Sequence, residues 1–118
     1  IHLVIADTGV QSKTSEVVAD VGKNREEYED FFVDIRTVVE HARDLMLDGE
    51  VLRLGPLMDD NHELLQKINV SSPELDNLVN AARGAGALGA KLSGAGRGGN
   101  MIALADENSK EIGQALMD

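Results

Sequence analysis

Residues 91–104 of this chain are Lys91-Leu92-Ser93-Gly94-Ala95-Gly96-Arg97-Gly98-Gly99-Asn100-Met101-Ile102-Ala103-Leu104. This segment places a cluster of glycines between two short apolar runs, residues 89–93 and 101–105, whose composition and length are typical of strands. Glycine adds no side-chain packing and loses much chain entropy when it is ordered, so this density indicates unusual backbone angles or a close approach to another group. We therefore expect a hairpin whose loop has a function.

The glycine loop by itself leaves two interpretations open. It lacks the Lys-Ser or Lys-Thr pair that completes a P-loop, and it joins strand to strand, whereas P-loops and dinucleotide-binding loops join strand to helix. What remains is either a long hairpin with left-handed residues or a backbone platform beside a phosphate or a partner loop. Arg97 is a lone cation among the glycines, so it either faces solvent or meets an anion.

Outward from the loop, the chain carries further strand and helix signals. The apolar run from Leu3 to Ala6 predicts a first strand, which ends at the turn residues Asp7-Thr8-Gly9. Apolar residues at three- and four-residue spacing then predict four helices before the hairpin and one after it. The first is capped by Ser12 or Thr14 and ends at Gly22, the second runs from Tyr28 to Gly49, the third is firm after Pro56 and ends at Ile68, the fourth begins at Ser71 or Ser72 and ends at Gly84, and the fifth spans Ser109 to Asp118.

This order of elements predicts an α+β fold, with an antiparallel sheet and helices packed on one face. The alternation in the last strand places Ile102 and Leu104 on one face and Met101 and Ala103 on the other. The chain of 118 residues is expected to be one domain, residues 1–118, with a core of Leu, Val, Ile, Met and Ala because only 3% of its residues are aromatic. It begins inside a strand pattern and stops in a helix pattern, so we expect it to be a piece of a longer protein.

Composition argues against several classes of function. The net charge of −10 disfavours a nucleic-acid partner, because such proteins need clustered cations. There is no cysteine and no apolar run long enough to cross a bilayer, so we expect a cytoplasmic protein with no membrane partner and no disulfides. His2, His41 and His62 lack metal-ligand spacing, so no metal site is predicted. His62 borders a buried stripe, where we expect a hydrogen bond to a neighbouring loop.

Several segments resemble, in order, the C-terminal domains of one kinase superfamily. The segments are Asp7-Thr8-Gly9-Val10 with Ser12-Lys13-Thr14, Asn61-His62-Glu63-Leu64-Leu65, Ser71-Ser72-Pro73-Glu74-Leu75-Asp76 and Lys91-Leu92-Ser93-Gly94-Ala95-Gly96. The superfamily includes galactokinase, homoserine kinase, mevalonate kinase and phosphomevalonate kinase. The combination is most similar to the mevalonate kinase branch, and Arg97 and Asn100 make it similar to the archaeal form.

The resemblance implies a ferredoxin-like C-terminal domain whose last strand is missing, from an enzyme that phosphorylates mevalonate with ATP and Mg²⁺ in isoprenoid biosynthesis. It implies no catalytic residue in this chain, because the phosphate-binding loop, the Mg²⁺ ligands and the catalytic Asp and Lys belong to an N-terminal domain. A homodimer is possible, and this chain alone is expected to be inactive. It would form one wall of the cleft, with Thr14, Gly94, Ala95 and Gly96 binding the substrate and Ser93, Arg97 and Gly98 binding the nucleotide.

The chain departs from the family pattern beside its first helix. Gln11 stands where proline is usual, and Ser15 stands where Arg or Lys is usual, so one anion contact is missing unless Lys13 replaces it. Two other functions stay open: a related kinase that acts on another small alcohol or on phosphomevalonate, and a non-catalytic binding or regulatory module with the same fold. Thr14 in turn is either a substrate contact or an ordinary residue of a helix start.

Overall fold

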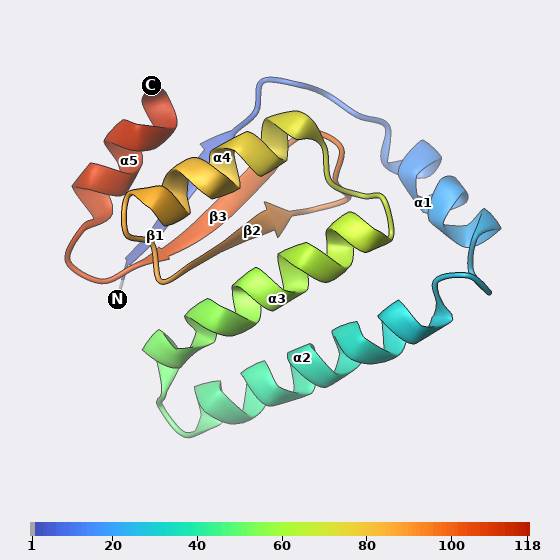
Figure 1. Ribbon diagram of the computed structural model, residues 1–118, viewed down its shortest axis with the longest axis horizontal. Helices are drawn as coiled ribbons and strands as arrows, with labels where there is room; N and C mark the ends of the chain where they lie inside the picture. Colours follow the sequence, from blue (N-terminus) through green and yellow to red (C-terminus); the bar gives the residue numbers. More distant parts are fainter. Residues whose placement is uncertain (1) are drawn as a thin grey trace.

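The computed structural model describes residues 2–118, and it contains a sheet and a series of helices in the predicted order (Figure 1). Strand β1 (His2–Asp7) leads into the helices, and the hairpin of β2 and β3 precedes the last one. The elements are β1 (His2–Asp7), α1 (Thr14–Lys23), α2 (Glu29–Leu47), the 3-10 turn η1 (Val51–Arg53), α3 (Leu54–Lys67), α4 (Pro73–Gly84), β2 (Gly89–Ser93), β3 (Asn100–Ala105) and α5 (Ser109–Met117).

The three strands form an antiparallel sheet in the order β1-β3-β2. In this register Leu3 pairs with Leu104, and Lys91 pairs with Ile102. Because neighbouring residues of a strand point to opposite faces, the register places Leu3, Lys91, Ile102 and Leu104 on one face. The predicted separation of Ile102 and Leu104 from Met101 and Ala103 is confirmed.

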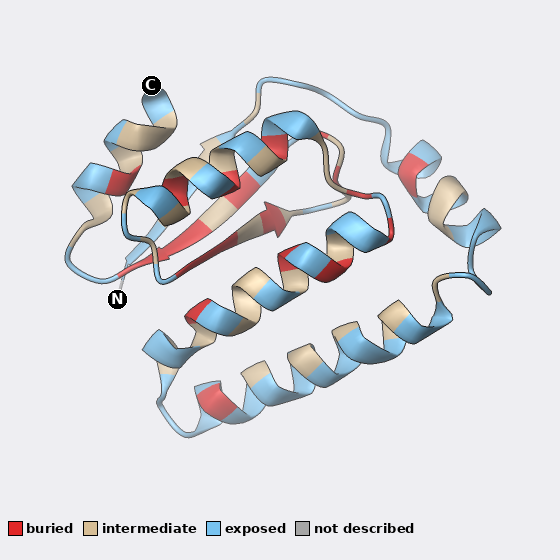
Figure 2. Cartoon of the chain, in the orientation of Figure 1, coloured by how far each residue is buried: buried red, intermediate tan, exposed pale blue. Residues whose placement is uncertain are grey.

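Helices α4 and α5 cover the other face of the sheet, and the core lies between them. Leu75 and Val79 of α4 and Ile112 of α5 are fully buried against Leu92 and Met101. Figure 2 shows these buried positions along β2, β3 and the inner side of α4. The α+β class with an antiparallel sheet and helices on one face is therefore confirmed.

Helix α3 runs along the edge of β2, and α2 packs on the far side of α3 (Figure 1). A Cβ atom added at Gly55 of α3 would collide with the Leu88 carbonyl, and one at Gly89 would collide with the Gly55 carbonyl. These two glycines let the helix backbone approach the strand backbone closely. Asp59 Oδ1 accepts a 2.9 Å hydrogen bond from the Ala90 amide, so a side chain of α3 satisfies part of the exposed strand edge.

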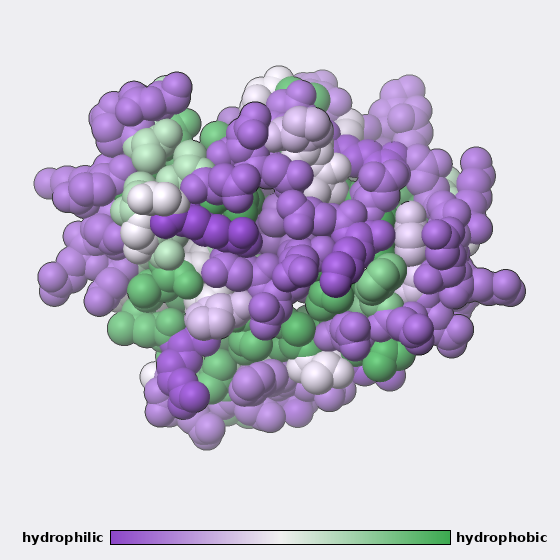
Figure 3. Space-filling model, viewed as in Figure 1, coloured by the Kyte–Doolittle hydropathy of each residue, from purple (hydrophilic) through white to green (hydrophobic). Residues whose placement is uncertain are grey.

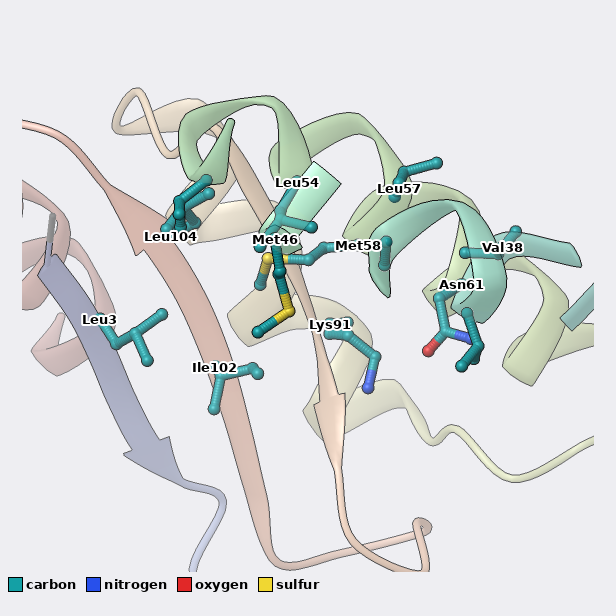
Figure 4. Close-up of a pocket in the computed structure, with 13 residues that line it drawn as sticks. Leu3, Val38, Met46, Leu54, Leu57, Met58, Asn61, Lys91, Ile102 and Leu104 are labelled. Atoms are coloured by element: carbon teal, nitrogen blue, oxygen red, sulfur yellow. The ribbon is translucent and has the colours of Figure 1, made fainter. Parts of the chain in front are cut away.

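The second sheet face borders an apolar groove of about 620 Å³. Figure 4 shows Leu3 and Ile102 of the sheet on one side, with Met46 of α2 and Leu54 and Met58 of α3 on the other. Leu3 keeps 60% of its surface exposed here. From the side drawn in Figure 3, hydrophobic atoms gather in a band between α2 and α3, and hydrophilic side chains cover most of the remaining surface.

Two local predictions about helix starts need correction, and of the two starts expected for α4 the Ser72 alternative is confirmed. Helix α3 begins at Leu54, two residues before Pro56, because a proline in the first turn loses no intrahelical hydrogen bond. Neither Ser12 nor Thr14 caps α1: Lys13 holds the N-cap position without a side-chain bond. At the start of α4, Ser72 is the cap and accepts from the Leu75 amide at 3.2 Å, with Pro73 at the first helical position.

Candidate functional site

The loop between β2 and β3 has the unusual backbone that its glycines predict. Gly94, Gly96 and Gly99 have φ angles of 94°, 98° and 75°, and Arg97 has a φ of 61°. Glycine adopts such angles without the Cβ clash that makes them costly for other residues. Loops that contain left-handed residues are able to gather backbone N–H groups into a concave site for anions.

The glycine loop lies between two other connections of the chain. Toward the α3–α4 connection, the Arg97 amide donates to the Val70 carbonyl at 2.7 Å, and a Cβ at Gly96 would collide with that same carbonyl. Toward the β1–α1 connection, the Gly99 amide donates to the Val10 carbonyl at 3.0 Å, and a Cβ at Gly98 would lie 2.5 Å from it. Gly96 and Gly98 are thus required because a side chain has no room there.

The β1–α1 connection and the glycine loop enclose a cavity of about 510 Å³. We call this the two-loop pocket. Ser12 joins its two sides, because its Oγ donates to the Gly96 carbonyl at 2.7 Å. The pocket is lined by Asp7, Gly9, Val10, Gln11, Ser12, Thr14, Ser93, Gly94, Ala95, Gly96, Gly98, Gly99 and Asn100.

Helix α1 begins at this pocket, and Thr14 is its first residue. The first amides of a helix carry partial positive charge and lack intrahelical acceptors, so they favour an anion. Several polar groups of the pocket residues make no hydrogen bond within residues 2–118, among them the amides of Gly94, Ala95 and Gly96 and the hydroxyls of Thr14 and Ser93. The pocket residues thus offer backbone donors and the hydroxyls of Thr14 and Ser93, a set suited to a phosphorylated or hydroxylated small molecule.

The structure gathers most of the predicted site residues in one place. Thr14, Gly94, Ala95, Gly96, Ser93 and Gly98 all line the two-loop pocket, although they come from two segments about 80 positions apart. Their roles toward substrate and nucleotide stay predictions. Arg97 does not line the pocket: its guanidinium is directed to Asp20 and to the Asn69 carbonyl instead.

Sequence reasoning missed several residues of the pocket wall. Asp7 and Asn100 are partners in the register at the open end of the sheet, and both line the pocket. Gln11 and Ser12 come from the turn before α1. The turn signal at Asp7-Thr8-Gly9 could have pointed to this wall, since a turn that ends one strand lies beside the hairpin loop of its antiparallel neighbour.

A buried polar network holds β2, and hence one end of the glycine loop, to the helices. His62 is 1% exposed, and its Nε2 donates to Asp76 Oδ1 at 2.9 Å. Burial lowers the pKa of His62, so the ring stays neutral. Hydrogen bonds from Ser71, Gln66 and His62 together outweigh burial and lower the pKa of Asp76. The expected polar partner of His62 is thus present, but it lies on α4 and not in a loop.

Three further observations concern Lys91, metal ligands and membrane spans. Lys91 points into the apolar groove shown in Figure 4, and burial lowers the pKa of its ammonium group. In residues 2–118, no group of three or more His, Asp or Glu side chains could hold a metal ion. No helix of this same part of the chain is long and apolar enough to cross a membrane.

Comparison with known proteins agrees with this architecture. Residues 42–117 match the model of the family described as GHMP kinases C terminal. The mevalonate kinase of Thermococcus onnurineus is 46% identical over 97% of this chain, which covers 37% of that kinase. The crystal structure of L. major mevalonate kinase in complex with R-mevalonate superposes on 98% of this chain, with a TM-score of 0.91 and 39% identity, and this chain covers 37% of it.

A second solved structure, the Methanococcus jannaschii mevalonate kinase, superposes on 98% of this chain with a TM-score of 0.78 and 36% identity. The chain therefore spans little more than a third of the length of the relatives that it matches. The family model covers most of the chain, including α3, α4, the glycine-loop hairpin and α5. From its sequence and its fold, this chain belongs to the GHMP kinases and is a C-terminal domain of that family.

Proposed function

We propose that this chain forms one wall of the active site of a mevalonate kinase, an enzyme that uses ATP and Mg²⁺ to phosphorylate mevalonate to 5-phosphomevalonate. The observation that carries the proposal is the two-loop pocket, where Thr14, Gly94, Ala95 and Gly96 line one cavity. The mevalonate kinases that match nearly the whole chain, at up to 46% identity, support this substrate.

In this proposal the residues of the chain bind and orient, and they do not perform the proton transfer. The Thr14 hydroxyl and the amides of Gly94 to Gly96 hold the alcohol, while Ser93 and Gly98 lie beside the nucleotide. Phosphoryl transfer depends mostly on positioning and on stabilisation of charge, which backbone donors provide without reorganisation. ATP supplies the phosphoryl group, and we expect the part of the relatives outside this chain to hold Mg²⁺, since the described residues contain no ligand cluster.

The test is a substrate panel on the full-length kinase, with the 118-residue chain as a second sample. Mevalonate, phosphomevalonate, galactose and homoserine are each supplied with Mg-ATP, and ADP release is measured. We expect turnover of mevalonate by the full-length kinase, no turnover by this chain alone, and only weak Mg-ATP binding to it by titration calorimetry. Preference for another alcohol would identify a related kinase, and no turnover of any would favour a non-catalytic module.

A further inference from the structure

Arg97 occupies a backbone conformation that suits glycine, yet its side chain makes two specific contacts. Its φ is 61°, and a glycine would adopt this angle without cost. The guanidinium Nη1 donates to Asp20 Oδ2 at 2.5 Å, and Nε donates to the Asn69 carbonyl at 3.0 Å. What an arginine adds at this position is therefore a link from the glycine loop to α1 and to the α3–α4 connection.

Helix α1 has few other anchors: Val17 packs in the core, Val21 packs against it, and Ser12 just before the helix donates to the Gly96 carbonyl. It lies beyond the end of the sheet, at the end of a long connection from β1 (Figure 1). Val17 is its buried residue, whereas Val18 is 63% exposed. Thr14 is the first residue of this helix, so a rotation or shift of α1 moves the Thr14 hydroxyl relative to Gly94 and Gly96 across the pocket.

We propose that Arg97 is a positioning residue, which holds α1 through Asp20 and thereby places Thr14 against the glycine loop. This inference rests on the proposed function, because it assigns Thr14 to substrate binding. The guanidinium is engaged by a carboxylate and a carbonyl of the protein, and Arg97 lies outside the pocket lining.

The Arg97–Asp20 ion pair fixes the position of α1 and adds little to the free energy of unfolding. The Arg97 and Asp20 side chains are 27% and 47% exposed, and ion pairs so accessible to water contribute little to unfolding free energy. A displacement of about 1 Å in a reacting group, by contrast, can cost about a hundredfold in rate. Loss of the pair should therefore leave the melting temperature nearly unchanged while it weakens use of the alcohol substrate.

The experiment compares Asp20→Asn, Arg97→Gln and the double variant in the full-length kinase. The controls are Asp34→Asn and Arg36→Gln, which change exposed residues of α2. We expect each single variant to lower kcat/KM for the alcohol about tenfold or more and to leave KM for ATP within about twofold. The double variant should be no worse than either single one, because both remove the same link. Arg97→Lys, which keeps a cation beside Asp20, should recover part of the loss.

Two kinetic results would overturn the proposal. If Arg97→Gln raises KM for ATP about tenfold while Asp20→Asn leaves it unchanged or lowers it, Arg97 contacts the nucleotide. If kcat/KM of both single variants stays within about twofold of the wild-type value for both substrates, the bond between Arg97 and Asp20 does not position Thr14.

Hydrogen exchange separates this proposal from the proposed function. In the full-length protein, Asp20→Asn and Arg97→Gln should accelerate amide exchange in residues 14–23, and the two control variants should not. If the wild-type protein had no kinase activity, the proposed function would be refuted. The exchange rates would still report whether the Arg97–Asp20 ion pair holds α1. Unchanged exchange in both variants would refute the positioning role even if the protein is an active kinase.

Discussion

His62 Nδ1 accepts a 3.1 Å hydrogen bond from the Leu92 amide, so a helix side chain takes the place of a neighbouring strand at the β2 edge. Because the amide must donate, Nδ1 is unprotonated, and the ring proton lies on Nε2, which donates to Asp76. Together with the bond from the Ala90 amide to Asp59, this bond satisfies two amides of β2 that point away from the sheet. Helix α3 thereby holds β2, which leads directly into the glycine loop.

The first prediction concerns the pH dependence of stability. Burial lowers the pKa of His62 below its ordinary value of 6.5, so below pH 6.5 the unfolded chain binds a proton that the folded chain does not. Stability is therefore full above about pH 6.5 and falls as the pH decreases toward the lowered pKa, by about 1.4 kcal/mol per unit of difference between the two pKa values. Urea unfolding at a series of pH values between about 7.5 and 5.5 measures this decrease in the free energy of unfolding.

Variants at two histidines identify the group responsible. His62→Asn keeps an acceptor near the position of Nδ1 but cannot titrate, so the fall in stability over this pH range should largely disappear. His41→Asn changes an exposed histidine of α2 and should retain the wild-type pH dependence. An undiminished acid effect in His62→Asn would assign the titration to another group.

The second prediction separates steric collision from backbone strain in the glycine loop. Gly94 and Gly96 have nearly the same φ, 94° and 98°, but an added Cβ at Gly94 meets nothing within 4 Å, whereas one at Gly96 meets the Val70 carbonyl. Gly94→Ala should cost about 1–2 kcal/mol from the positive φ alone. Gly96→Ala should cost clearly more and abolish kinase activity in the full-length protein, because the loop must move. Equal costs in denaturant unfolding would contradict this account.

The third prediction concerns the Thr14 hydroxyl. Lys13, not Thr14, holds the N-cap position of α1, so Thr14→Ala removes no helix cap. Stability should change by less than about 0.5 kcal/mol. In the full-length kinase, kcat/KM for mevalonate should fall about tenfold or more, equivalent to about 1.4 kcal/mol of transition-state stabilisation. Steady-state kinetics and thermal unfolding of the same samples measure both effects.

Thr37→Ala serves as the matched control for Thr14. Its hydroxyl donates to the Val33 carbonyl on an exposed part of α2, away from the two-loop pocket. It should leave the kinetic constants unchanged. If Thr14→Ala lowers stability while kcat and KM stay within about twofold, Thr14 supports the helix and does not contact the substrate.

The fourth prediction tests the close approach of α3 to β2. Gly55→Ala places a Cβ against the Leu88 carbonyl, so it should destabilise the chain by about 1–3 kcal/mol despite the better helix propensity of alanine. Gly113→Ala, in α5, meets nothing within 4 Å and should stabilise by up to about 1 kcal/mol. Denaturant unfolding of the two variants should therefore give opposite signs. A stabilised Gly55→Ala variant would refute the close approach.

Local patterns in the sequence were sufficient for the elements and for the identity of the glycine loop. Apolar spacing predicted the five helices and three strands, because burial of one face imposes a period on each element. The Ser72-Pro73 start of α4 and the left-handed Gly49 after α2 follow from chemistry within one turn. The prediction that Thr14 and the glycine loop share one site came from the resemblance to known kinases and not from a local pattern.

Only the tertiary structure decided which distant groups meet. Gln11, Ser12 and Asn100 joined the pocket wall because antiparallel pairing of β1 and β3 brings two connections together, and no spacing along the chain records that pairing. The guanidinium of Arg97, for which a nucleotide contact stays a prediction, is bonded in the folded chain to Asp20, which lies 77 positions away. The choice between solvent, ligand and carboxylate for such a cation depends on which segment packs beside it, and packing is a property of the folded chain.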